Sequence, residues 1–144
     1  MSLDIYLEKK ESGKVTESNQ HSVEHDGLNG SWETQKLWIR NSSPSYYYED
    51  VKIILDIPDA PVKPNVSPKG IIYQLVEGDI EPTVLEWKSL PYHNDIDIGD
   101  IGSSDSADTS TYYPFWLRTY VPGATAVGRI QEASLKIEAI QNAI

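Results

Sequence analysis

Short segments in which apolar and polar residues alternate recur along this chain, and they constrain its fold more than any other feature. In "YEDVKIILDIP" (48–58), Val51, Ile53 and Leu55 fall on one side of an extended chain and Lys52 falls on the other. Proline, glycine and "NG" or "DG" turn signals separate this segment from others of the same kind. A period of two residues is that of a β-strand with one buried face, so we expect a chain built from strands.

The strand signal occurs in several segments, at residues 4–8, 32–40, 48–58, 70–78, 83–90, 95–102 and 111–122. The segments 70–78 and 83–90 are expected to pair with each other. Short strands separated by turns favour an all-β fold, namely an antiparallel immunoglobulin-like β-sandwich of about seven to nine short strands. At 144 residues, the chain is expected to form a single domain, 1–144.

The two ends of the chain are expected to extend this domain. Residues 1–30 are expected to include an N-terminal arm, because a long polar segment follows the first predicted strand. The C-terminal tail, residues 129–144, fits two structures. Heptad spacing of apolar residues such as Ile130 and Ile137 favours a helix, whereas alternation in the same tail favours a closing strand. We expect the strand, and the helix stays the alternative.

The charge of the chain argues against several classes of partner. The formal net charge is −10. Between Glu77 and Asp108, nine acidic residues stand against Lys88 alone. Such a field repels phosphate, so no nucleic-acid partner is expected. The start "MSLDIYLEKK" has no apolar signal region and no run approaches a membrane span, so we expect no membrane partner and synthesis in a cytoplasm.

Two segments share the order apolar, Trp, apolar, Arg: "KLWIRN" (36–41) and "PFWLRT" (114–119). In an extended chain, the residues that flank each Trp point to the core, and Trp and Arg point to the other face. The predicted patch, which we take as a partner interface, consists of Trp38, Arg40, Trp116, Arg118 and Tyr120. Several large rings exceed the apolar area that a monomer usually leaves bare, so either a loop of this chain or another molecule is expected to cover them.

The succession "LWIRNSSPSYYYEDVKIIL … IDIGDIGSSDSADTSTYYPFWLRTYVPGAT" resembles a pattern of virion proteins from tailed bacteriophages. There, a strand ending in Arg-Asn precedes a "Y-x-D-V" strand, and later an "I-x-[IL]-G-x-I" strand and a polar loop lead to "[FV]-W-[LV]-R" and "V-P". The match covers Leu37 to Val121. The resemblance implies a non-enzymatic accessory component without cofactors, located in the virion, that binds major capsid or tail proteins and forms a homo-oligomer there. We expect a capsid decoration or cement protein, with a tail, neck or baseplate accessory protein as the alternative.

A function of another class also fits the aromatic residues. In a carbohydrate-binding module, Trp38, Trp116 and Tyr120 would stack on sugar rings, together with the cluster Tyr46–Tyr48. Arginine and aspartate side chains would then contact the sugar hydroxyls. This alternative stays open at the level of the sequence.

Catalytic and metal sites are weakly indicated. "HSVEH" (21–25) matches a zinc peptidase pattern, but that pattern needs a helix, and the glycines and turn formers that follow oppose one. The aspartates of "NDIDIGDIGSSDSAD" (94–108) have the oxygen chemistry that calcium prefers but not the EF-hand spacing, so a solvated acidic edge is expected. There is no cysteine, nucleophile elbow or phosphate-binding loop. We therefore expect no enzyme, no metal and no cofactor.

Overall fold

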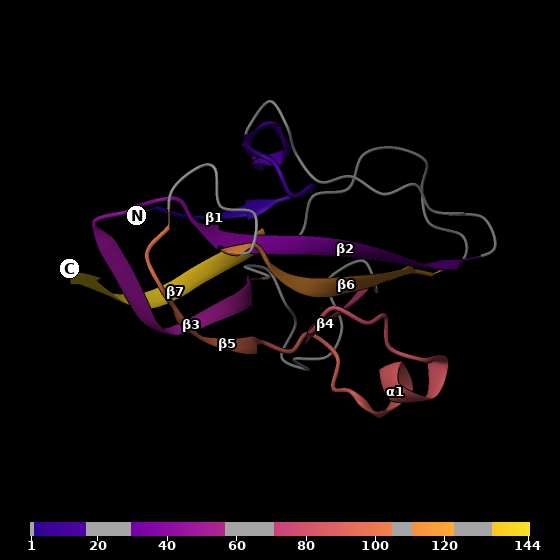
Figure 1. The fold of residues 1–144 in the computed structure, drawn as a ribbon. Helices are drawn as coiled ribbons and strands as arrows, with labels where there is room; N and C mark the ends of the chain where they lie inside the picture. The colour runs from indigo at the N-terminus through magenta and orange to yellow at the C-terminus, as the bar shows by residue number, and fades with distance from the viewer. Residues whose placement is uncertain (1, 17–29, 57–70, 105–110, 123–133) are drawn as a thin grey trace.

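The computed structural model describes residues 2–16, 30–56, 71–104, 111–122 and 134–144. These ranges form, in chain order, β1 (Leu3–Tyr6), the short 3-10 turn η1 (Glu11–Gly13), β2 (Ser31–Asn41), β3 (Tyr46–Asp56), β4 (Ile72–Glu77), α1 (Val84–Ser89), β5 (Ile96–Ile101), β6 (Tyr113–Val121) and β7 (Ser134–Ala143) (Figure 1). Strands dominate the described residues, which confirms the prediction of an all-β fold.

The strands form two antiparallel sheets that pack as a sandwich. The larger sheet has the order β1-β2-β6-β4, and the smaller sheet has the order β5-β3-β7. Both sheets contribute to one core, whose buried members are Leu3, Leu37, Ile39, Tyr48, Val51, Ile53, Leu75, Ile101, Phe115 and Leu117. The central strand of the smaller sheet is β3, and the immunoglobulin-like classification of this arrangement stays a prediction.

The alternation of the sequence accounts for the core. On β3, Val51 and Ile53 are buried and Lys52 between them is exposed, as the pattern predicts. On β2, Leu37 and Ile39 point to the same core. Full burial of an aliphatic side chain of this size contributes roughly 1.5–3 kcal/mol relative to exposure, so these residues are a major source of stability.

The tail of the chain is a strand where the structure describes it. β7 pairs with β3 in an antiparallel register that sets Ile137 opposite Ile53. The expectation of a closing strand is confirmed for Ser134–Ala143, and the helical alternative is wrong there. Residues 129–133 lie outside the described part of the chain.

One predicted strand is a helix. Residues 83–90 were expected to be extended, but α1 occupies Val84–Ser89. Thr83 caps its first turn: the Thr83 hydroxyl accepts from the Glu86 N–H at 3.2 Å, and the Glu86 carboxylate accepts from the Thr83 N–H at 3.1 Å. This reciprocal capping box supplies partners for N–H groups that a helix leaves free, which favours the helix over a strand.

The hydroxyl of Tyr48 joins strands from the two ends of the described fold. Tyr48 is buried in the core. Its hydroxyl accepts from the Ser2 N–H at 3.0 Å and donates to the Gln141 side-chain carbonyl at 2.9 Å. A single oxygen therefore links the residue before β1 to β7.

Candidate interaction surface

The outer face of the larger sheet, which turns away from the core, carries a row of aromatic and basic side chains. The antiparallel register sets Trp32 opposite Tyr120, and Lys36 opposite Trp116. We call this surface the aromatic face, defined by Trp32, Trp38, Trp116, Arg118 and Tyr120. The structure thus places four of the five predicted interface residues, and the unpredicted Trp32, on one face of one sheet.

Lys36 lies between two indole rings of this face. Its ammonium group is 5.5 Å from the ring centre of Trp38 and 5.5 Å from that of Trp116. The same ammonium group pairs with the Asp79 carboxylate at 2.6 Å. This hydrogen bond and the positive charge of Lys36 hold the pKa of Asp79 below its ordinary value. Lys36 therefore links the segment that follows β4 to the aromatic face through an exposed ion pair.

Arg118 makes a second stack with tryptophan. Its guanidinium lies 3.9 Å from the ring centre of Trp32 and 5.6 Å from that of Trp87, the buried residue of α1. Trp32 also contacts Tyr120, with ring centres 4.8 Å apart. Burial lowers the pKa of Arg118, while Tyr92 raises it by a smaller amount. The stack leaves Trp32 37% exposed, so its ring is available to a partner.

Arg40 differs from the expectation for the patch, because it is fully buried. Its guanidinium lies 5.0 Å from the ring centre of Tyr112, and its Nε donates to the Thr111 hydroxyl at 3.2 Å. Tyr112 in turn packs edge-on against Tyr6 with ring centres 5.1 Å apart. The two terminal nitrogens of Arg40 have no hydrogen-bond partner within the described part of the chain. Arg40 therefore does not contribute to an exposed contact surface in this structure.

Two of the three indole N–H groups of the aromatic face are buried. The Nε1 atoms of Trp38 and Trp116 are buried and have no hydrogen-bond partner among the described residues. Both residues are half-buried. This part of the face is therefore partly covered and partly open, and the choice between cover by the chain itself and cover by another molecule stays a prediction.

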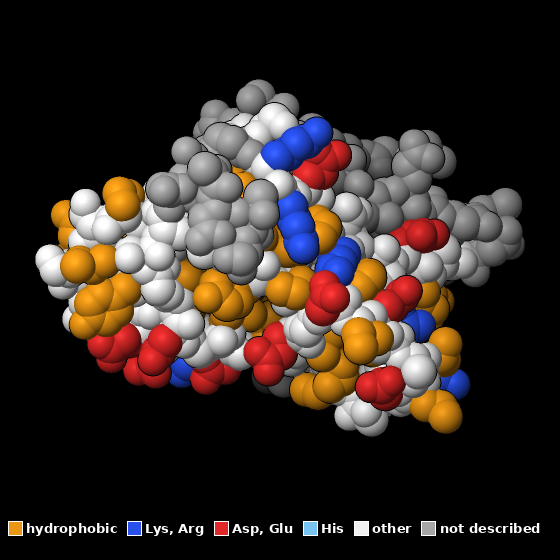
Figure 2. All heavy atoms as spheres, in the orientation of Figure 1, with side chains coloured by type: hydrophobic (Ala, Val, Ile, Leu, Met, Phe, Trp, Pro, Cys, Tyr) orange, Lys and Arg blue, Asp and Glu red, His pale blue; other side chains and the backbone are white. Residues whose placement is uncertain are grey.

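The segment around α1 adds exposed apolar side chains that the sequence reasoning missed. Ile80, Val84 and Leu85 are 86%, 60% and 78% exposed, and we call them the α1 apex. Figure 2 shows hydrophobic side chains gathered over α1 at the lower right of the molecule. The apex adjoins the aromatic face, because Asp79 binds Lys36 at one end and Trp87 contacts Arg118 at the other. The signal that could have found it is the "TVLE" capping pattern, which predicts a helix rather than a strand here.

Gln74 of β4 holds α1 in place. Its side-chain N–H₂ group donates to the backbone carbonyl of Trp87 at 3.0 Å and to that of Leu90 at 3.1 Å. Gln74 is buried, so both bonds are shielded from water. The segment is therefore anchored by the Trp87 side chain and by two backbone carbonyls, which sets the face that the helix turns outward.

The expected tyrosine cluster does not form one surface. Tyr46 and Tyr47 are exposed on β3, in the smaller sheet, whereas Tyr48 is buried in the core. None of the three lies in the sheet that carries Trp38, Trp116 and Tyr120.

The aspartates of the acidic segment bind backbone groups where the structure describes them. Asp95, Asp97 and Asp100 accept from the backbone N–H groups of Leu55, Gly99 and Asp50 at 3.0–3.1 Å. Asp105 and Asp108 lie outside the described residues, as does the "HSVEH" motif with His21, Glu24 and His25. Within the described ranges, no three His, Asp or Glu side chains gather as a metal site would need. No helix in those ranges is long and apolar enough to cross a membrane.

No family model, curated protein or solved structure matches this chain. A function therefore has to be inferred from the residues of this surface together with the resemblance in the sequence.

Proposed function

We propose that this chain is a non-enzymatic structural protein of a tailed-bacteriophage virion that docks onto a neighbouring virion protein through the aromatic face and the α1 apex. The observation that carries the proposal is the continuity of the two surfaces. Leu85 is 78% exposed on a helix whose Trp87 packs on Arg118, and Arg118 stacks on the exposed ring of Trp32. The assignment of this chain to a phage particle comes from the sequence resemblance over Leu37 to Val121.

The composition of this surface is that of a binding hot spot. Trp, Tyr and Arg contribute most of the energy in protein interfaces, and they do so where neighbouring contacts exclude water. Trp32 and Arg118 are already held by their mutual stack at 3.9 Å, so docking would cost little side-chain entropy. In a symmetric particle, many such contacts reinforce one another even when each is modest.

Within the particle, we prefer a location on the capsid, where this chain would act as a decoration protein. A tail, neck or baseplate accessory protein would use the same surface, and the resemblance covers both. Asp97 and Asp100 lie on β5 of the other sheet, where they would keep free subunits apart in solution without blocking the docking surface. Asp79 and Glu86 lie beside the α1 apex, so a partner that docks there would also contact their carboxylates.

A carbohydrate-binding function has less support. A sugar stacks on an open ring face, but Lys36 occupies a face of both Trp38 and Trp116, and Arg118 occupies a face of Trp32. A glycan array with the purified protein separates the two functions: binding to a defined sugar that Trp116→Ala abolishes in a folded protein would favour this alternative over docking.

The test is binding of the purified chain to particles of the phage whose genome encodes it, prepared without this protein. We expect saturable co-sedimentation with heads, and co-sedimentation with isolated tails would assign the alternative location. Trp32→Ala should weaken binding by about 30-fold, the effect of one hot-spot residue. Tyr47→Ala is the matched control, because Tyr47 is about as exposed as Trp32 but lies on the other sheet. Absence of binding to either particle, or equal loss in both variants, would overturn the proposal.

A further inference from the structure

The two edges of the larger sheet are closed by other parts of the chain. At β1, the Val15 N–H donates to the Ile5 carbonyl at 2.8 Å, and the Leu7 N–H donates to the Gly13 carbonyl at 2.7 Å. At β4, the side-chain amide of Asn94 replaces a neighbouring strand. Its oxygen accepts from the Leu75 N–H at 2.9 Å, and its N–H₂ group donates to the Leu75 carbonyl at 2.6 Å. A further strand therefore finds few free backbone groups at these edges.

The two edges of the smaller sheet differ from each other. β5 is only six residues long, contains Gly99 at a φ of 87°, and carries Asp97 and Asp100. A short, irregular and acidic edge discourages pairing with another strand. β7 is ten residues long and contains neither glycine nor proline, and its only described neighbour is β3. It is the one long, regular edge in the described part of the fold.

The unpaired backbone groups of β7 belong to its odd-numbered residues. The Ile144 N–H donates to the Ser45 carbonyl at 3.0 Å, which shows that even-numbered residues of this segment point their backbone groups to β3. Successive residues of an antiparallel strand point these groups to alternate sides. The groups of Leu135, Ile137 and Ala139 therefore point away from the sheet, and nothing in the described part of the chain bonds to them there.

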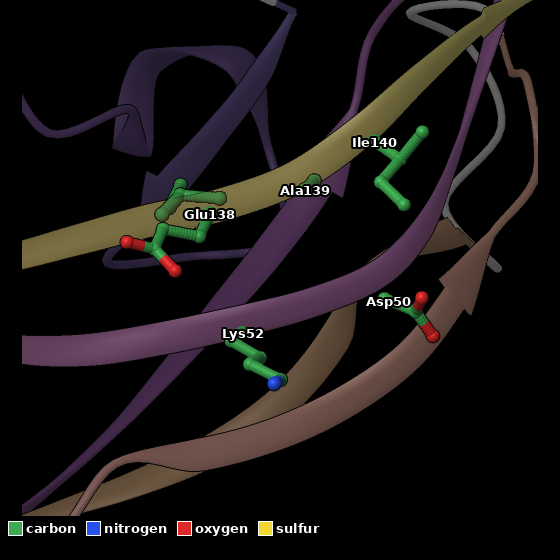
Figure 3. Close-up of a pocket in the computed structure, with 6 residues that line it drawn as sticks. Asp50, Lys52, Glu138, Ala139 and Ile140 are labelled. Carbon is green, nitrogen blue, oxygen red and sulfur yellow. The ribbon is translucent and has the colours of Figure 1, made fainter.

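The core is also incomplete along this edge. Leu135, Ile137 and Ala139 direct their side chains to the core, yet all three are only half-buried. On the outer face of the same strand, Ile140 is 55% exposed beside a shallow hollow lined by Lys52 and Glu138 (Figure 3). An additional strand at this edge would cover both apolar surfaces.

We propose that β7 pairs with β7 of a second copy of this chain, antiparallel about a two-fold axis at Ile137, which joins two three-stranded sheets into one of six strands. In this register Lys136 of each copy lies opposite Glu138 of the other, and Leu135 lies opposite Ala139. The apolar side of the strand thus continues the core side of the sheet across the axis.

Charge complementarity selects this register among its neighbours. A shift of the axis by one residue sets Lys136 opposite Lys136 of the second copy, or Glu138 opposite Glu138, and like charges directly opposite are unfavourable. The favoured register also extends a pattern already present inside the sheet. Lys52 lies opposite Asp97 on one side and opposite Glu138 on the other, so Lys136 of the second copy is the next opposite charge in that row.

The inference does not depend on the proposed function, because it uses the smaller sheet and a partner that is identical to this chain. The aromatic face and the α1 apex lie on the other sheet or beside it. A dimer formed through β7 therefore leaves the docking surface free, and failure of one proposal leaves the other standing.

The test is sedimentation equilibrium of the wild-type chain and two charge variants. We expect the wild type to form dimers. Lys136→Glu and Glu138→Lys each place like charges at both opposed pairs, so each variant alone should dimerise about tenfold more weakly or worse. An equimolar mixture of the two variants restores two opposite-charge pairs, and we expect it to recover wild-type association as a heterodimer.

Both substitutions are at exposed positions, and the thermal midpoint of each variant reports whether its fold is intact. Lys136→Glu also removes an ion pair with Asp56 at 2.8 Å, and Glu138→Lys controls for that loss. Ala139→Pro removes an outward N–H and should give a folded monomer. A wild type that is monomeric up to about 1 mM would overturn the inference. So would a dimer that survives both charge variants, or a mixture that associates no better than its components.

Discussion

On the outer side of the larger sheet, neighbouring strands set indole rings against lysine and arginine. On the outer side of the smaller sheet, they set lysine against aspartate and glutamate, and we call that surface the charged face. Lys36 and Arg118 stack on tryptophans at 3.9–5.5 Å, whereas Lys52 has Asp97 and Glu138 as its cross-strand neighbours. Both faces lie on antiparallel sheets of one sandwich, so the difference comes from side chains and not from topology.

A sheet that buries one face in a core can present its other face in two ways. Alternating charges keep a face hydrated, and such a face needs no cover. Cation–aromatic stacks hide part of each ring but leave apolar surface that favours contact with protein. The aromatic face therefore contributes to the stability of this chain and is the surface that we propose for binding, whereas the charged face needs no cover.

The largest expected effect comes from Trp87. Trp87→Ala should lower the free energy of unfolding by about 3–5 kcal/mol, because it empties a buried site between α1 and the aromatic face. Ile54→Ala, at a half-buried position of β3 that turns away from the core, should cost only about 1 kcal/mol. Urea unfolding of both variants measures the difference. Equal losses would show that the two outer faces contribute alike to stability, contrary to the comparison.

Replacement of Arg40 tests whether the stability of the fold depends on the buried positive charge on the aromatic side of the larger sheet. Arg40→Met should change the free energy of unfolding by less than about 1 kcal/mol, or stabilise the fold. A buried guanidinium whose two terminal nitrogens have no hydrogen-bond partner among the described residues carries a desolvation cost that methionine avoids. The measurement is again urea unfolding, with Arg40→Ala as a control that also removes packing. A loss above about 3 kcal/mol for Arg40→Met would mean that the charge itself is needed.

The smallest expected effect concerns Asp79. Its pKa in the folded protein lies below the unfolded-state value of about 3.9, so its contribution to stability is present above that pH. It is lost as the pH falls through the folded-state pKa. Lys36→Met should return the Asp79 pKa toward its ordinary value, as measured by NMR titration of the carboxyl carbon. Lys52→Met, on the charged face, should leave that titration unchanged; an equal shift in both variants would rule out a specific pair.

Most of the fold was predictable because alternation depends on local sequence alone. Leu37, Ile39 and Phe115 are buried, as their positions beside the tryptophans predict. The helix α1 was missed because six residues are too few to show a helical period, and only its capping pattern marks it. The closing strand was predicted for the right reason, since Leu135 and Ile137 do face the core.

The candidate surface was predictable only in part. Trp38 and Trp116 share a face because strand geometry requires it, whatever their neighbours are. Burial of Arg40 depends on Tyr112, and the register between distant strands decides where Tyr112 lies. The amide of Asn94 replaces a strand at Leu75 for the same reason. Contacts of this kind need the tertiary structure, which no single segment encodes.

The hydroxyl of Tyr48 has a consequence for how this sandwich opens. Because one oxygen holds both Ser2 and Gln141, detachment of β7 removes a partner from the beginning of β1, and detachment of β1 does the same to β7. Amide hydrogens of the first and last strands should therefore exchange with solvent at correlated rates. Local breathing at this end of the molecule would then be a concerted event and not two separate frayings.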